Sequence, residues 1–273
     1  MNLVAIDIGN TNVTVGLFVG DSEKFIESVS GDDTDKLGAL LVEAWEQIPL
    51  VTSADVDLRD GSIVVSSVKG EWTKKVREIC KAKLDETIKV IGVDINLPIE
   101  MGVENPMDVG TDRVVAAAAA FAVVEDAVVV ADFGTAVTID LVDEEGVFMG
   151  GVIAPGFTIS AKALSERTAK LPEIDVHTPK DAVGGNTEEA VNAGLLKTVV
   201  EKYAEEIGRW PHTIVTGGDF GIIKDECAFV DSWVSNLVVR GVVLAYKKHL
   251  AVQGEIAEFE TEDAKLADKN KRR

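Results

Sequence analysis

The sequence predicts an α/β protein built of two similar halves, and three observations lead to this prediction. An apolar strand ends at Asp7, where a turn with the pattern Asp-x-Gly leads into an alternating strand. The same pattern recurs at Asp132, with Thr135 in its turn. Strands and helices of similar order surround both copies, and a hydrophobic content of 46% is enough to build a core. Two matching hairpins in two matching halves predict a duplicated fold that holds a phosphate between them.

The first of these turns has the composition of a phosphate-binding loop. Gly9 has no side chain, so a phosphate can approach the backbone N–H groups there. Asn10, Thr11 and Asn12 add neutral donors, and Asp7 can hold a hydrated Mg²⁺ against the phosphate. An ordinary Asn/Gly-rich hairpin turn explains this stretch when it is taken alone. The second copy favours the phosphate loop.

The first half has the predicted order β-β-β-α-β-α-β. Asp33 and Thr34 are typical helix caps, and the apolar spacing after them predicts a helix to about Gln47 with one buried face. Residues 55–61 form a polar connection. The other elements expected after the first hairpin are strands at 25–29, 62–68 and 87–91 and a helix at about 71–84.

The second half repeats this scheme after an irregular surface loop at 95–110. The Ala-rich helix expected at 114–124 permits close packing between halves or between subunits, and a buried connecting helix explains it equally well. Strands are expected at 127–132, 136–142, 146–153, 212–215 and 228–230, and helices at 158–167, 188–207 and 234–250. The predicted domains are therefore 1–113 and 114–253, followed by a frayed or disordered charged tail at 254–273.

The composition excludes several classes of partner. A net charge of −20 disfavours binding to nucleic acid and to anionic membranes. The N-terminus has no basic region of a signal peptide, and the apolar stretch at 114–124 is too short to span a bilayer. Cys80 and Cys227 have no metal-like spacing, so we expect buried, reduced thiols and a cytoplasmic protein.

Gly110-Thr111-Asp112-Arg113 lies at the expected boundary between the halves. An acid and a base at a helix start commonly serve as a cap and a solvated charge. The functional alternative makes Asp112 a general base and Arg113 a clamp for a substrate carboxylate. The residues alone leave both interpretations open.

Two further segments also have both a structural and a functional interpretation. Thr216-Gly217-Gly218 follows an apolar strand, where consecutive glycines give a flat ring or a phosphate room against the backbone. Gly184-Gly185-Asn186-Thr187 precedes a helix, so Asn186 or Thr187 is expected to cap it, and an exposed helix start can also bind a polar substrate group. The sequence contains neither a P-loop nor a GxGxxG motif.

With these residues in view, the chain resembles the type III pantothenate kinases, which belong to the acetate-kinase, sugar-kinase, Hsp70 and actin superfamily. The resemblance covers roughly residues 2–250, and the ordered set of motifs is specific although each motif alone is not. The matching motifs are Asp7-Ile-Gly-Asn-Thr-Asn12, Ser66-Ser-Val68, Asn105-Pro106, Gly110-Thr-Asp-Arg113, Asp132-Phe-Gly-Thr-Ala136, Ile153-Ala-Pro-Gly156, Ala163–Pro172, Asn186-Thr187 and Thr216-Gly-Gly218.

The resemblance implies two RNase H-like (actin-like) halves with mixed sheets and an interdomain ATP cleft. It implies ATP-dependent phosphorylation of the primary hydroxyl of pantothenate, the first step towards coenzyme A, by a homodimer with the substrate pocket at the subunit contact. Asp112 would be the base, and Asp132 would hold K⁺ or NH₄⁺. The implied ATP contacts are Asp7 with Mg²⁺, Ile8, Gly9, Asn10, Thr11, Asn12, Val13, Thr14, Thr135, Gly217 and Gly218, and the implied substrate contacts are Val103, Gly110, Thr111, Asp112, Arg113 and Thr187.

Two positions depart from the family pattern. A pocket tyrosine is expected near Val103, and Gly185 stands where the family has a lysine. Both departures concern substrate affinity more than phosphoryl transfer. Two alternatives therefore stay open: a non-catalytic regulatory relative, and a kinase of the same fold for another small alcohol that carries a carboxylate.

Overall fold

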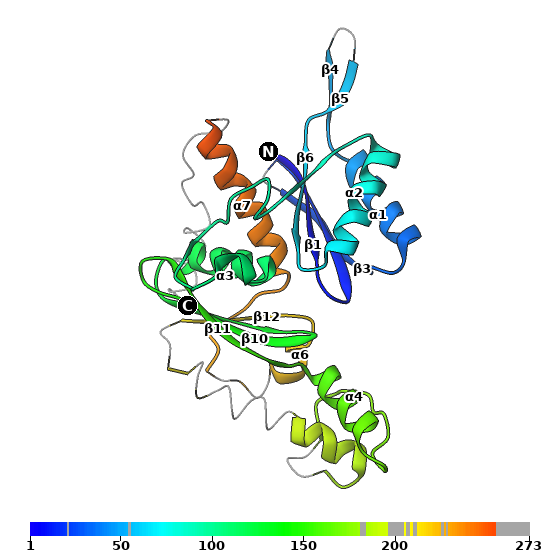
Figure 1. Ribbon diagram of the computed structural model, residues 1–273, viewed down its shortest axis with the longest axis vertical. Coiled ribbons are helices and arrows are strands. Elements are labelled where there is room, and N and C mark those ends of the chain that lie inside the picture. Colours follow the sequence, from blue (N-terminus) through cyan, green and yellow to red (C-terminus); the bar gives the residue numbers. More distant parts are fainter. Residues whose placement is uncertain are drawn as a thin grey trace. The chain divides into compact units, whose positions relative to one another are not determined.

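The computed structural model describes residues 1–20, 22–53, 56–180, 184–195, 205, 208–209, 212–224, 227 and 229–254. The chain forms two compact units, and Figure 1 gives the path of the chain through them. The first contains Met1–Glu100, Glu104–Ala119 and the described residues from Val238 onward, and the second contains Met101–Val103 and Ala120–Leu237.

The first unit is built on a five-stranded sheet with the order β3-β2-β1-β6-β7. Its first three strands are antiparallel, and β6 and β7 continue the sheet in parallel to β1. The strands are β1 (Asn2–Ile8), β2 (Asn12–Val19), β3 (Ser22–Ser30), β6 (Ser62–Ser67) and β7 (Ile88–Val90).

Helices cover both faces of this sheet, so β1 is apolar along nearly its whole length. Val4 and Ile6 pack with α1 (Thr34–Glu46) and α2 (Gly70–Leu84) in one core cluster. Leu3 and Ala5 point to the opposite face, where they pack with α3 (Thr111–Val124) and α7 (Leu237–Gln253). The predicted cap of the first helix is confirmed, because Asp33 Oδ1 accepts a hydrogen bond from Lys36 N at 3.1 Å.

The second unit repeats the strand arrangement, which confirms the predicted duplication. Its sheet has the order β13-β12-β9-β10-β11-β8, in which β9, β10 and β11 are antiparallel and β12 and β13 are parallel to β9. Thus β9 corresponds to β1, and β12 corresponds to β6. The elements are β8 (Glu100–Met101), β9 (Val128–Phe133), β10 (Ala136–Val142), β11 (Val147–Pro155), β12 (Thr213–Thr216), β13 (Ser232–Trp233), α4 (Phe157–Arg167) and α6 (Phe220–Ile223).

The Ala-rich helix is buried, in agreement with its interpretation as a buried connecting helix. Val114 through Ala120 of α3 are all buried. A Cβ on Gly241 of α7 would lie 2.0 Å from the backbone oxygen of Val115, so glycine is what allows α7 to cross α3 so closely. The first unit extends beyond the expected boundary at residue 113, to Ala119, and it also contains α7 from Val238 onward, whereas the predicted second half included this helix.

Two predictions of local structure are wrong. The expected polar connection at 55–61 is mostly a hairpin, β4 (Leu50–Ser53) with β5 (Val56–Arg59). Its strands have four residues each, too few to give a periodic signal, and cross-strand pairing stabilises them. The last short strand is β13 at Ser232–Trp233 instead of 228–230, because pairing with Ile214 and Val215 decides its position.

Other predictions fall partly outside the described residues. These are the tail beyond Gly254 and the end of the helix expected at 188–207. A short 3₁₀ helix, η1 (Pro106–Asp108), lies within the loop expected at 95–110.

In the described part of the chain, no helix has the length and apolar character needed to cross a membrane.

Candidate active site

The hairpin at the end of β1 has the predicted form. Asp7 is half-buried and lies in register with Thr14 of β2 and Ser66 of β6. Gly9 N donates to the backbone oxygen of Asn12 at 3.0 Å and closes the turn. The tip residues Asn10, Thr11 and Asn12 are exposed, whereas Ile8 and Val13 are buried and offer only their backbone.

The start of α3 is tied to the strand beside Asp7. Thr111 Oγ1 accepts hydrogen bonds from Ser66 Oγ and Ser67 N, each at 3.1 Å, and donates to Ser67 O at 3.1 Å. Because Ser66 lies opposite Asp7, these bonds fix the beginning of α3 close to the first hairpin. The Thr111 hydroxyl, expected to contact substrate, is therefore engaged in this connection. Ser66 and Ser67 had no predicted role beyond their place in a family motif.

Asp112 occupies the first turn of α3. Its Oδ1 accepts a hydrogen bond from Arg113 N at 2.8 Å. Burial raises the pKa of this carboxyl above its usual value of 3.8, and the N–H and charge of Arg113 oppose part of the shift. A Cβ on Gly110 would lie 2.5 Å from Asp112 Oδ1, so the glycine leaves space for the carboxylate. A carboxylate that holds a proton more tightly than usual is a suitable general base.

The second hairpin is a structural copy of the first. Asp132 lies in register with Thr138 of β10 and Thr216 of β12, as Asp7 does with Thr14 and Ser66. Gly134 N donates to the backbone oxygen of Ala136 at 3.1 Å, which closes this turn. Thr135 lies exposed at the tip.

Gly217 brings the backbone after β12 directly against this second hairpin. Its φ is +101°, a conformation that side chains disfavour, and a Cβ there would lie 2.3 Å from Phe133 O and 2.5 Å from Asp132 Oδ1. Asp219 N donates to Phe133 O at 2.8 Å and holds the two segments together. The adjacent Gly218 is exposed, with open space where a Cβ would project.

The oxygens gathered here suit a hard cation rather than a transition metal. The Asp132 carboxylate and the Phe133 carbonyl both face the Gly217 backbone. Within the described residues, no group of three or more His, Cys, Asp or Glu side chains could cage a metal ion. Carboxylate and carbonyl oxygens are the ligands that hard cations take.

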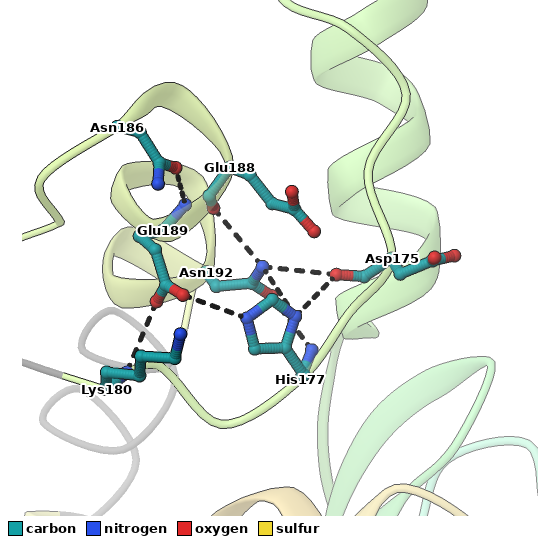
Figure 2. A network of polar contacts seen from close by, with 7 residues as sticks. All are labelled: Asp175, His177, Lys180, Asn186, Glu188, Glu189 and Asn192. Atoms are coloured by element: carbon teal, nitrogen blue, oxygen red, sulfur yellow. Dashed lines mark hydrogen bonds and ion pairs between the residues drawn. The ribbon is translucent and has the colours of Figure 1, made fainter.

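Thr187 begins a helical stretch at 187–195 that a polar network holds in place (Figure 2). Asn186 is its cap, because Asn186 Oδ1 accepts from Glu189 N at 2.9 Å. The buried Asn192 joins the helix to the preceding segment: its Oδ1 accepts from His177 N at 3.0 Å, and its Nδ2 donates to the backbone oxygen of Asp175 at 3.1 Å. Sequence reasoning missed Asn192, since nothing in the pattern marks it as buried.

Charged partners complete this network. Glu189 Oε1 lies 3.5 Å from His177 Nε2, and Glu189 Oε2 accepts from Lys180 N at 3.2 Å. The Asp175 carbonyl and the Glu189 carboxylate raise the pKa of His177, and the Lys180 N–H together with His177 lowers the pKa of Glu189. The segment at 175–180 thus fixes the helix start that presents Thr187.

The predicted site residues are divided between the two units. The first unit holds Asp7 through Thr14 together with Gly110 through Arg113. The second holds Asp132, Thr135, Gly217 and Gly218, and also Val103 and Thr187. Val103 lies over β11, with its Cγ1 3.3 Å from the position of a Cβ on Gly150.

Comparisons with known proteins show the family of this chain. A family model described as type III pantothenate kinase matches residues 3–207. Proteins of that name from Agathobacter rectalis and Syntrophotalea carbinolica are 36% and 34% identical to this chain. Each alignment covers 90% of this chain, and 97% and 99% of the respective relative.

Solved structures extend the likeness to the fold. A Baf family protein from Campylobacter jejuni has a TM-score of 0.58 at 19% identity, over 94% of this chain and 100% of that chain. The ethanolamine utilization protein EutJ from Carboxydothermus hydrogenoformans has a TM-score of 0.50 at 15% identity, over 90% and 89%. At these identities the similarity concerns the fold alone.

Proposed function

The chain belongs to the type III pantothenate kinase family, and we propose that it transfers the terminal phosphoryl group of ATP to the primary hydroxyl of pantothenate. This reaction forms 4′-phosphopantothenate, the first step of coenzyme A biosynthesis. The observation that carries the proposal is the connection from Asp7 through Ser66 and Thr111 to Asp112. It ties a phosphate-type hairpin to a carboxyl whose pKa is raised.

Asp112 is the proposed base. Phosphoryl transfer to an alcohol needs no protein nucleophile; it needs positioning, charge stabilisation and a group that takes the hydroxyl proton. As the hydroxyl oxygen attacks phosphorus and the bond to the leaving oxygen of ADP breaks, Asp112 accepts the proton. The bond from Arg113 N holds the carboxylate in one orientation for this task.

The substrate contacts follow from the same segment. The Arg113 guanidinium pairs with the pantothenate carboxylate, since a bidentate fork suits that group. Gly110 gives the substrate and the Asp112 carboxylate room, and Thr187 supplies a hydroxyl from a capped helix start. Thr111 acts through its backbone and through its anchoring of α3. Val103 lines the pantothenate pocket, where the family often has a tyrosine.

The ATP contacts are the backbone and tip residues of the first hairpin, with Thr135, Gly217 and Gly218 from the second unit. Asp7 is the proposed Mg²⁺ residue: its carboxylate, followed by exposed amide and hydroxyl groups, is an oxygen donor set that suits Mg²⁺ with phosphate and water. When bound, Mg²⁺ neutralises charge on the phosphates. Asp132 and the Phe133 carbonyl are the proposed ligands of K⁺ or NH₄⁺.

We also propose a cytoplasmic homodimer. Exposed apolar side chains on β11 and α4 offer a surface for a second copy: Met149, Ile153, Ile159 and Leu164 are 47%, 64%, 44% and 37% exposed. Cys80 and Cys227 are buried thiols that form no disulfide, which suits a reducing compartment. Light scattering that gives the mass of a single chain at micromolar concentration would contradict the dimer.

The direct test is an assay of ADP release with ATP and Mg²⁺, with and without pantothenate, in matched K⁺, NH₄⁺ and Na⁺ salts. We expect release that depends on pantothenate and is faster in K⁺ or NH₄⁺ than in Na⁺. If the protein binds ATP but adding pantothenate causes no ADP release, a regulatory relative or a kinase for another substrate would be favoured instead. Equal rates in all three salts would contradict the proposal that Asp132 binds K⁺ or NH₄⁺.

A further inference from the structure

A lysine that the family motifs do not include lies against the first hairpin. Lys69 Nζ donates to the backbone oxygen of Asn10 at 3.2 Å, at the tip of the proposed phosphate loop. The same Nζ lies 3.3 Å from the centroid of the Trp72 ring. A cation is therefore held in contact with the loop before any phosphate arrives.

Hydrogen bonds on both sides fix the position of the Lys69 main chain. Val68 N donates to Ile8 O at 3.0 Å, so the chain just before Lys69 is bonded to the residue just before Gly9. Lys69 N donates to Ser67 Oγ at 3.1 Å, and Thr73 Oγ1 donates to Ser67 Oγ at 2.6 Å. The main chain of Lys69 is thus tied on one side to β1 and on the other to the first turn of α2.

The ring beneath the ammonium group is also fixed. Trp72 is 3% exposed, and its ring packs so closely on the backbone of Gly31 that a Cβ there would lie 2.2 Å from Cε3. A cation over an immobile aromatic face has lost part of its rotamer freedom before it binds an anion. Its hydrogen bond to the Asn10 carbonyl is exposed, so exchanging that neutral acceptor for a phosphate oxygen costs little.

Charge supplies the reason for such an exchange. The loop from Asp7 to Thr14 contains one acid and no basic residue, in a chain with a net charge of −20. A polyphosphate bound there meets a repulsive field unless cations stand close to it. We propose that Lys69 Nζ leaves the Asn10 carbonyl and binds the phosphates of ATP at this hairpin. This inference rests on the proposed function, in which the first hairpin is the phosphate loop.

The test compares three variants. Lys69→Gln removes the charge, Lys69→Arg keeps it, and Lys74→Gln is the control. Lys74 lies in α2, the helix that begins directly after Lys69. Its side chain is 78% exposed and its Nζ lies 4.0 Å from Glu78 Oε1, so Lys74→Gln makes the same change of net charge without removing the contact with Asn10. Calorimetry without pantothenate measures the affinity for a non-hydrolysable ATP analogue and for AMP, both with Mg²⁺ and at constant K⁺.

We expect Lys69→Gln to weaken binding of the ATP analogue by about 10- to 100-fold, as for other charge-assisted hydrogen bonds. AMP binding should change much less, Lys69→Arg should retain most of the affinity, and Lys74→Gln should match the wild type. Raising the salt concentration should narrow the gap between Lys69→Gln and the wild type. In turnover, KM for ATP should rise while KM for pantothenate stays within about threefold.

Three results would overturn the inference. One is an ATP-analogue affinity of Lys69→Gln equal to that of Lys74→Gln. Another is a loss of AMP affinity in Lys69→Gln as large as its loss of affinity for the ATP analogue. The third is a lower melting temperature of free Lys69→Gln combined with a wild-type increase in melting temperature when the analogue is added, which would mean that Lys69 only supports the fold. Wild type that binds the analogue but does not phosphorylate pantothenate would contradict the proposed reaction and leave the Lys69 comparison intact. Wild type that binds no nucleotide would contradict both.

Discussion

Asp112→Asn is expected to lower kcat by about 10²- to 10⁴-fold, because it removes the proposed base that takes the hydroxyl proton. Asparagine is nearly isosteric, and its amide oxygen can still accept the hydrogen bond from Arg113 N. Substrate binding should therefore change less than turnover. The measurement is steady-state ADP release with both substrates varied. A kcat within about threefold of wild type would exclude Asp112 as the base.

The pH dependence gives an independent check of this role. Because burial raises the pKa of Asp112, the base becomes protonated at a pH above the usual aspartate range. We expect kcat/KM of the wild type to fall as the pH drops through this raised pKa, and the residual activity of Asp112→Asn to lack that limb. If kcat/KM of the wild type falls with an apparent pKa at or below 3.8, the ordinary value for an aspartate, the raised pKa of Asp112 would be contradicted.

Stability should respond in the opposite direction from activity. A carboxyl whose pKa is higher in the folded state stabilises the fold only while it is protonated, and this contribution is lost as the pH rises through the folded pKa. At a pH above this raised pKa, the ionised Asp112 is an unfavourable buried charge. Asp112→Asn removes it, so the variant should melt no lower than the wild type. A marked loss of melting temperature would mean that the low turnover reflects damage to the fold.

Gly217→Ala is expected to destabilise the protein by about 2–4 kcal/mol, since it combines a strained backbone with an overpacked site. The residue has φ +101°, and the added methyl would lie 2.3 Å from Phe133 O and 2.5 Å from Asp132 Oδ1. Both neighbours belong to the second hairpin, so relief of the clash displaces the proposed ion ligands. Activation by K⁺ should therefore weaken together with stability.

The adjacent glycine provides the matched control. Gly218 has open space where a Cβ would project, and Gly218→Ala should change stability by less than about 0.5 kcal/mol. Urea unfolding of both variants and the wild type, followed by circular dichroism, measures the difference. Equal midpoints for Gly217→Ala and Gly218→Ala would show that the backbone approach at Asp132 is not a tight constraint.

Much of the site could be predicted from local sequence, because its parts are strand ends followed by turns. Asp7 and Asp132 each occupy the position expected from the Asp-x-Gly pattern, and the register pairs of the two aspartates correspond. Asn186 could be named as one of two caps from the residue types alone. What periodicity could not reveal were side chains whose roles depend on distant partners. Ser66, Asn192 and Lys69 acquire theirs from Thr111, His177 and Asn10.

By itself, the sequence determined the duplicated α/β fold, the family and the residues of both hairpins, because these depend on apolar periodicity and on short motifs read along the chain. Tertiary structure alone decided that α7 packs with the first unit, that β4 and β5 pair, and that the Gly217 backbone lies against Asp132. It also decided that Asp112 is buried enough for its pKa to rise. Packing and desolvation depend on residues brought together from distant parts of the chain, and no local pattern records them.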